Sequence, residues 1–249
     1  SQIRDRTFYF FWQGDRTPLF NYVHRPHQRI EDLLKSVKNK EGDPMSEVHN
    51  KNIPSEDTVY NWILEQHGMS HKEFIESLEQ PNLNLYNVLD TMGKNKYDGW
   101  DSIIEDLSKR EDDGAKRWHR VLKRMSDKER NGGGVMRRTI TLPNDYIGAF
   151  VGHLPTQLIH PVEDRYLTYR EMLSIMYLPE DFELLNPRGS YNHICQNVPV
   201  KTAQDMMEQI KLYFDNKLDL IDTKYLLQDN KRKVYECEQD YLQLDEFMV

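Results

Sequence analysis

A short stretch from Leu167 to Glu171 constrains the fold most, because it specifies where a helix begins. Thr168 is a favoured N-cap residue, and Glu171, three positions later, can bond back to the backbone of Thr168 in a capping box. Large apolar residues recur at helical spacing around this start: Leu167, Met172, Ile175 and Met176. The pattern predicts an amphipathic helix with one buried face, and Pro179 marks its end.

Helical patterns also fill most of the chain before the glycine-rich run Asn131–Gly134. They cover five segments, at about residues 27–40, 55–67, 70–78, 97–110 and 115–130. Ser55 and Ser70 are the expected N-caps of the second and third segments, and Gly68 is an expected C-terminal stop.

Strand patterns occur near the start of the chain and again after residue 134. The aromatic and β-branched run Thr7–Trp12 predicts a buried strand. Three later runs have strand patterns bounded by proline or glycine: residues 135–142, 146–154 and 155–160. A loop through Pro187 and Gly189 is expected before a last helix at about residues 201–217.

Length and composition limit the class of protein. At 249 residues the chain can form one or two domains. It has no run of the roughly 18 to 20 apolar residues that a membrane span needs, so we expect a cytoplasmic protein with no membrane partner. Cys195 and Cys237 have no metal-ligand spacing and are expected to be free thiols. The abrupt start at Ser1 suggests the C-terminal part of a longer protein.

Basic residues are concentrated in Ala115–Arg138, although the formal net charge of the chain is −8. This segment carries nine bases against only Asp127 and Glu129: Lys116, Arg117, Arg120, Lys123, Arg124, Lys128, Arg130, Arg137 and Arg138. Such a local concentration predicts contact with DNA phosphates, for which the best candidates are Arg124, Lys128, Arg130, Arg137 and Arg138. A solvated charged helix is the alternative, and Trp118 is expected in the core.

Several motifs are similar to those of the cytosine-C5 DNA methyltransferases. Residues 165–182, RYLTYREMLSIMYLPEDF, resemble the family helix RxLTxREaarlmgFPddF, and residues 194–199, ICQNVP, resemble its IGNxVP turn. Residues 2–6 resemble its QxRxR element, and residues 137–142 resemble the strand before the last two motifs. The chain departs from these patterns where Tyr177 and Cys195 replace glycines and Gln196 replaces the asparagine.

The resemblance implies roles for individual residues. Arg6 would contact the target cytosine, Arg4 would support the same pocket, and Thr141 would donate to the backbone of the flipped nucleotide. The C-terminal turn would face the methyl donor, S-adenosyl-L-methionine, through Gln196, Asn197 and Val198.

The resemblance also implies an α/β fold. It is expected to be the C-terminal part of a doubly wound S-adenosylmethionine-dependent methyltransferase fold with a mixed α+β target-recognition domain. Residues 1–14 would be a strand of the catalytic domain, and residues 15–161 the recognition domain. Residues 162–235 would form helices that return to the catalytic domain, before an acidic tail at residues 236–249.

The catalytic motifs of this family are missing from the sequence. These enzymes add a cysteine thiolate from a Pro-Cys loop to C6 of cytosine, but neither cysteine here follows a proline. We therefore expect the recognition half or subunit of a DNA (cytosine-5-)-methyltransferase, inactive alone. It would bind double-stranded DNA and form a heterodimer with an N-terminal half that carries the nucleophile. The alternative is a non-catalytic DNA-binding or regulatory protein derived from a methyltransferase.

The last nine residues, Tyr241–Val249, alternate acids with large apolar residues. Such a tail could dock on a partner, for instance a replication clamp, and a solvated terminus is the alternative.

Overall fold

The computed structural model describes residues 10–20, 28–80, 83–147 and 156–222. Contacts divide the chain into two compact units. The described part of unit 1 lies within residues 28–197, and that of unit 2 comprises residues 10–20 and 198–222.

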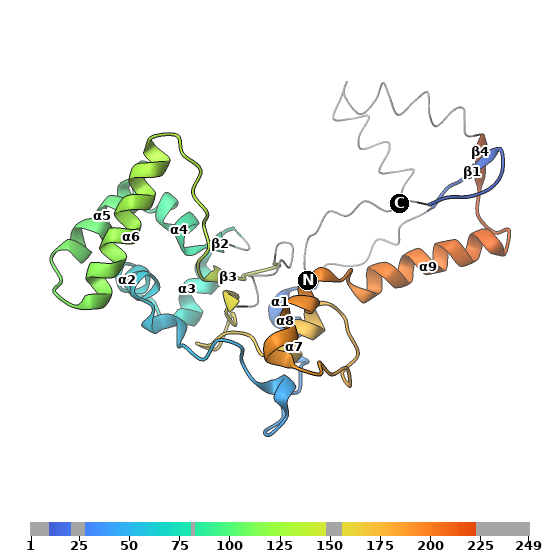
Figure 1. The fold of residues 1–249 in the computed structure, drawn as a ribbon, viewed down its shortest axis with the longest axis horizontal. Coiled ribbons are helices and arrows are strands. Elements are labelled where there is room, and N and C mark those ends of the chain that lie inside the picture. The colour runs from blue at the N-terminus through green and yellow to red at the C-terminus, as the bar shows by residue number, and fades with distance from the viewer. Residues whose placement is uncertain (1–9, 21–27, 81–82, 148–155, 223–249) are drawn as a thin grey trace. The chain divides into compact units, whose positions relative to one another are not determined.

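Unit 1 is mainly helical (Figure 1). Its α-helices are α1 Ile30–Lys35, α2 Thr58–His67, α3 His71–Ser77, α4 Leu85–Thr91, α5 Asp98–Ser108, α6 Asp113–Arg130, α7 Tyr169–Ile175 and α8 Pro187–Gln196. Two short 3-10 helices cover Pro44–Ser46 and Pro54–Glu56. The strands β2, Leu83–Asn84, and β3, Thr141–Leu142, pair antiparallel.

Local side-chain caps set several of these helix ends. The Asp57 carboxylate accepts hydrogen bonds from the backbone of Val59 and Tyr60 and so begins α2. Gly68 ends α2 with a φ of 62°, in the left-handed region that glycine adopts without a Cβ clash. Ser70 then starts α3 through a capping box with Glu73.

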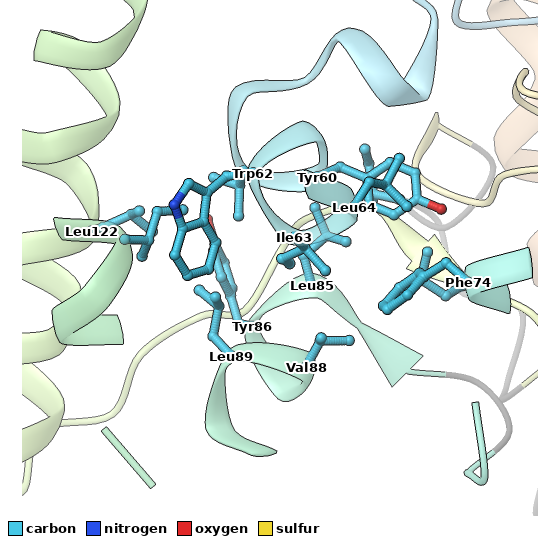
Figure 2. Packing of buried hydrophobic residues seen from close by; sticks show 14 of the residues in the cluster. Tyr60, Trp62, Ile63, Leu64, Phe74, Leu85, Tyr86, Val88, Leu89 and Leu122 are labelled. Atoms are coloured by element: carbon cyan, nitrogen blue, oxygen red, sulfur yellow. The ribbon is translucent and has the colours of Figure 1, made fainter. Parts of the chain in front are cut away.

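Helices α2 to α6 enclose a hydrophobic core, which we call cluster 1 (Figure 2). Trp100, Tyr60 and Phe74 are its largest fully buried side chains. Helices α5 and α6 lie side by side, and α6 contributes Leu122, toward which the indole of Trp62 points. Because an α-helix repeats every ~3.6 residues, burying this face leaves the opposite face of α6 to solvent.

Helices α1, α7 and α8 form a second core, cluster 2. The apolar stripe predicted for α7 is confirmed, since Leu167, Met172 and Ile175 are 0% exposed and Met176 is 1% exposed. Cys195, a free thiol as predicted, is buried in the same cluster.

Two short stretches, residues 158–159 and 166–167, connect the two cores. Leu158 belongs to cluster 2 and Ile159 to cluster 1, while Tyr166 belongs to cluster 1 and Leu167 to cluster 2. Ile159 and Tyr166 form an antiparallel bridge, and Leu158 forms a parallel bridge to Thr141. Successive residues of extended backbone point to opposite sides, so each of the two stretches packs on both cores.

Unit 2 contains one helix and two strands among its described residues. Strand β1, Arg16–Pro18, pairs antiparallel with β4, Leu220–Asp222, in the register Arg16↔Asp222. Helix α9, Val200–Phe214, agrees with the helix predicted at residues 201–217 and has no buried residue. Within the described ranges, no helix is long and apolar enough to cross a membrane.

Several predictions about secondary structure were wrong. Ser55 does not cap α2, because a 3-10 turn at Pro54–Glu56 precedes the helix and Ser55 bonds instead to Asp164. Residues 10–12 are not a buried strand, and Phe11 is 96% exposed. The remainder of the predicted strand at residues 7–12 lies outside the described residues.

Two further corrections concern the second half of the chain. The strand predicted at residues 135–142 is reduced to Thr141–Leu142, because the preceding residues are held by side-chain contacts rather than by a neighbouring strand. The loop predicted through Pro187 and Gly189 is helix α8. Pro187 occupies its first turn, where no backbone N–H is needed, and Asn186 caps it. Most of the predicted strand at residues 146–154, and the acidic tail, lie outside the described residues.

A buried histidine of α3, His71, contacts the chain at His160, next to the stretch 158–159. The ring of His71 lies 2.8 Å from the carbonyl oxygen of His160 through Nε2 and 3.1 Å from the Tyr60 hydroxyl through Nδ1. A neutral ring satisfies both partners, since Nε2 donates to the carbonyl and Nδ1 accepts from the hydroxyl. Burial lowers the pKa of His71 despite the nearby Asp164 carboxylate, and burial also lowers the pKa of His160.

These histidines predict that acid destabilises the fold. Below a pH of about 6.5 these histidines are protonated in the unfolded chain but stay neutral in the folded chain. The free energy of unfolding therefore decreases as the pH is lowered, by at most about 1.4 kcal/mol per pH unit for each histidine. Denaturant unfolding measured from about pH 8 to about pH 5 should show this slope. His71→Gln, which keeps hydrogen-bonding groups but cannot be protonated, should reduce the slope. A wild-type free energy that stays constant over this range would contradict the assignment.

Candidate nucleic-acid interface

Helix α6 presents a basic face to solvent. Ala115, Leu122 and Ser126 are its buried residues, and they lie on one side of the helix. The exposed residues opposite them carry most of the bases in the helix: Lys116, Arg117, Arg120, Lys123, Arg124 and Lys128. Trp118, expected in the core, is half-buried and packs against cluster 1. The burial pattern of α6 therefore gathers the charged side chains into one stripe.

The bases of this stripe have no ion pair with any described residue, unlike most other cations of unit 1. Asp127 is the acid among them, and it is also exposed. Arg130 differs, because it binds Asp101 at 2.6 Å and its guanidinium lies 4.4 Å from the centre of the Tyr97 ring. Unpaired, solvated cations at helical spacing suit a polyanion better than a carboxylate partner within the fold.

The glycine run after α6 forms an ordered C-cap. Gly132 has a φ of 76°, and its backbone N–H donates to the carbonyl of Glu129 at 2.9 Å. The N–H of Gly133 donates to the carbonyl of Lys128 at 2.9 Å, which completes a Schellman motif. A Cβ on Gly133 would lie 3.0 Å from that carbonyl oxygen, so the close approach also requires glycine there.

Arg137 lies in a clamp between two carboxylates. Its guanidinium donates to Glu129 at 2.7 and 2.8 Å and to Asp90, and it lies 5.8 Å from the centre of the Trp100 ring. Asp90 also accepts from the Trp100 indole N–H at 2.8 Å. Burial alone would lower the pKa of Arg137, but its hydrogen bonds to both carboxylates raise it. The clamp joins α4, α5 and α6 to the chain that follows α6.

The other predicted DNA contacts differ in exposure. Arg138 is exposed and has no ion pair with a described residue. Thr141 is 8% exposed and lies in β3, where its backbone N–H donates to Gln157. Arg4 and Arg6 lie outside the described residues. The roles of all these residues in binding DNA stay predictions.

The capping box predicted for α7 is confirmed and is part of a larger buried network. Thr168 accepts from the backbone of Glu171 at 3.1 Å, and the Glu171 carboxylate accepts from the backbone of Thr168 at 2.9 Å. Arg165 donates two hydrogen bonds to the same carboxylate, at 2.7 and 2.8 Å, and Asn39 donates another at 3.0 Å. Burial would raise the pKa of Glu171, but the bonds and charge of Arg165 outweigh it and leave that pKa lowered.

The segment predicted to face the methyl donor ends α8. Gln196 is exposed, and the Asn197 amide donates to the carbonyl of His193 at 2.7 Å. Val198, which is half-buried, belongs to unit 2, so the three residues are not described as one site. The residues present supply amide and apolar groups, which are of the kinds that a methyl donor could contact.

The two glycine replacements have different structural consequences. Tyr177 has a φ of 55°, so the position keeps the left-handed backbone for which a glycine is suited. Cys195 lies inside α8, where no positive φ is needed. The helical backbone at this position therefore accepts a residue with a Cβ.

Sequence reasoning missed partners of two charged side chains that it had singled out, Arg137 and Glu171. Asp90 lies 47 residues before Arg137, and Asn39 lies 132 residues before Glu171. No local pattern marks either pair, because each forms only when segments distant in sequence pack together.

A helical unit with a stripe of unpaired bases defines a protein suited to bind a polyanion. The chain matches the family model for C-5 cytosine-specific DNA methylases over residues 1–212, and it belongs to that family. It is therefore related to cytosine methyltransferases, which bind DNA and normally use S-adenosylmethionine. Neither the curated proteins nor the solved structures contain a match to it.

The buried capping network predicts a large effect of Glu171→Ala. Its carboxylate is 2% exposed, so truncation leaves Arg165 and the backbone N–H of Thr168 without their buried partner. The free energy of unfolding should fall by about 3 kcal/mol, measured by denaturant unfolding. Glu73→Ala is the matched control, because Glu73 has the same capping role in α3 but is exposed. Equal effects of the two substitutions would contradict the importance of the buried pair.

Proposed function

We propose that this chain is the DNA-recognition half of a cytosine-C5 DNA methyltransferase and completes its active site with a separate N-terminal half. The observation that carries the proposal is that a member of this family has no cysteine placed to attack cytosine. Cys195 is 2% exposed within α8, and Cys237 is followed by Glu238 in an acidic segment. A thiol enclosed in an apolar core cannot reach an extruded base.

The stripe on α6 supports the DNA-binding part of the proposal. Cations that bind phosphates release condensed counterions, which favours association with duplex DNA even when the protein is acidic overall. Lys116, Arg120 and Lys123 follow one another at helical spacing, and the stripe extends over the length of α6. Arg124 and Lys128 lie on this stripe and remain our candidates for phosphate contact.

The two ends of the matched region would contribute to the active site. Arg4 and Arg6 would hold the target cytosine, as the QxRxR resemblance implies. Gln196, Asn197 and Val198 would border S-adenosylmethionine, whose methyl group is the one transferred, while the other half supplies most of the pocket. In this proposal the N-terminal half also supplies the doubly wound sheet, and residues 15–161 form the recognition domain.

Complementation tests this proposal directly. The chain should not transfer methyl groups from S-adenosylmethionine to duplex DNA alone, but should do so when mixed with a matched half that carries Pro-Cys and FxGxG motifs. Tritiated methyl incorporation is the measurement. The control replaces the cysteine of that half with alanine, which removes the nucleophile and should abolish transfer.

Two results would reject the proposal. Methylation by this chain alone would show that the nucleophile is present in it. Duplex binding with no transfer in any matched mixture would favour the alternative, a non-catalytic DNA-binding protein. One observation favours that alternative, because the Asn197 amide is already bonded to His193 within α8.

The α6 stripe predicts a salt-dependent loss of binding. Lys123→Ala combined with Arg124→Ala should weaken duplex binding for all sequences and reduce the slope of log K against log salt by about 1 to 2, because each phosphate contact contributes about 0.9. Fluorescence anisotropy with labelled duplexes at several salt concentrations measures both quantities. Lys35→Ala combined with Lys72→Ala is the matched control, since it removes the same charge from α1 and α3. Equal slopes for the two double variants would argue against α6 as the phosphate-binding surface.

A further inference from the structure

The chain between the α6 cap and β3 alternates between exposed and enclosed side chains. Met136 is 67% exposed and Arg138 is exposed, whereas Val135, Arg137 and Thr139 are half-buried. This alternation is the pattern of an extended segment with one side on the protein and the other in solvent. Residues 135–139 are nevertheless not paired with any described strand.

Side-chain and backbone anchors at three points hold this segment in place. The Schellman motif fixes its start at Gly133, and the Ile140 carbonyl fixes its end by accepting from the backbone of Leu85 at 3.2 Å. Between them Arg137 binds Asp90 on α4 and Glu129 on α6. Met136 and Arg138 therefore flank an arginine that three helices hold, because Trp100 of α5 also lies against it.

We propose that Met136 and Arg138 read base edges of the duplex, and that Arg137 is a positioning residue that holds them in register. The inference rests on the proposed DNA-binding function and identifies the residues that would give it sequence preference. An arginine on a fixed backbone can donate bidentate hydrogen bonds to guanine O6 and N7, and an apolar side chain can contact a thymine methyl group.

The spacing of the pair agrees with reading neighbouring base pairs. Residues i and i+2 of extended backbone lie about 6.6 Å apart, which is close to two steps of a duplex at about 3.4 Å each. Met136 and Arg138 would therefore reach positions about two base pairs apart when the segment follows the groove. Arg137 cannot take part without leaving both Asp90 and Glu129. Asp90 would then keep the Trp100 indole N–H as a partner and Glu129 would keep Lys96, but both carboxylates would lose their guanidinium beside a phosphate backbone.

The experiment selects duplexes from a random pool, first with the full chain alone and then with the chain mixed with its N-terminal half. The wild-type protein should enrich sequences with a guanine at one position and a second preferred base nearby. Arg138→Ala should remove the guanine preference with a loss of discrimination of about tenfold, and Met136→Ala should relax only the second position. Both side chains are exposed, so both variants should fold. Lys123→Ala combined with Arg124→Ala should weaken binding to duplexes of all sequences equally.

Arg137→Lys separates positioning from phosphate contact. Lysine keeps the charge but cannot bind two carboxylates with a planar fork, so the variant should lose discrimination at both positions while keeping its salt slope. If Arg137 only contacted a phosphate, lysine would replace it with little change in preference. The double variant Asp90→Asn with Glu129→Gln should likewise lose discrimination, although removal of two negative charges should strengthen binding to all duplexes.

The outcomes distinguish this inference from the proposed function. The base-reading role of Met136 and Arg138 is wrong if the wild-type protein binds every duplex equally, or if Arg138→Ala and Met136→Ala leave the enriched sequence unchanged. DNA binding by α6 would still stand in either case. If Arg137→Lys keeps full discrimination, the positioning role is wrong. If the chain binds no duplex, either alone or mixed with its N-terminal half, the proposed function is wrong, and so is the base-reading role of Met136 and Arg138.

Discussion

The alternation of side chains in two short stretches, residues 158–159 and 166–167, is the constraint on which unit 1 depends. Leu158 and Leu167 pack into one core, whereas Ile159 and Tyr166 pack into the other. Because the period of extended backbone is two, a shift of one residue would place each side chain in the wrong core. The chain between these stretches carries the His160 carbonyl that binds His71 and the Arg165 that binds Glu171, so polar contacts fix the register that the apolar residues require.

Unit 1 divides its cations between two roles. Arg137 and Arg165 each bind two carboxylates and are only partly exposed, which leaves their charge neutralised within the fold. The α6 bases have no such partners among the described residues, and they lie opposite a face that is buried in cluster 1. A whole-chain formal charge of −8 therefore gives little information about this surface, because the acids are not distributed like the bases.

Predictions from sequence succeeded where local chemistry decides the outcome. The Ser70 N-cap, the Thr168 capping box and the Gly68 stop each involve residues within a few positions of each other, and all three are confirmed. Ser55 failed as a cap because its hydroxyl binds Asp164, 109 residues away. Arg137 was predicted to contact DNA on composition, but its partners lie on helices whose packing no local pattern specifies. The predicted roles of Arg138, Thr141 and Gln196 depend on a ligand and stay predictions.

The two departures from the family pattern at glycine positions are not equivalent. Cys195 is helical, so the replacement makes no demand on the backbone, and its side chain fills space in cluster 2. Tyr177 keeps a φ of 55°. A backbone in this left-handed region costs a residue with a Cβ about 1 kcal/mol or more in conformational energy. Tyr177 also packs against cluster 2, and a glycine would lose that contact. Packing of a large aromatic ring can offset the backbone strain, so the left-handed turn after α7 persists without glycine and still directs the chain from α7 toward Pro179.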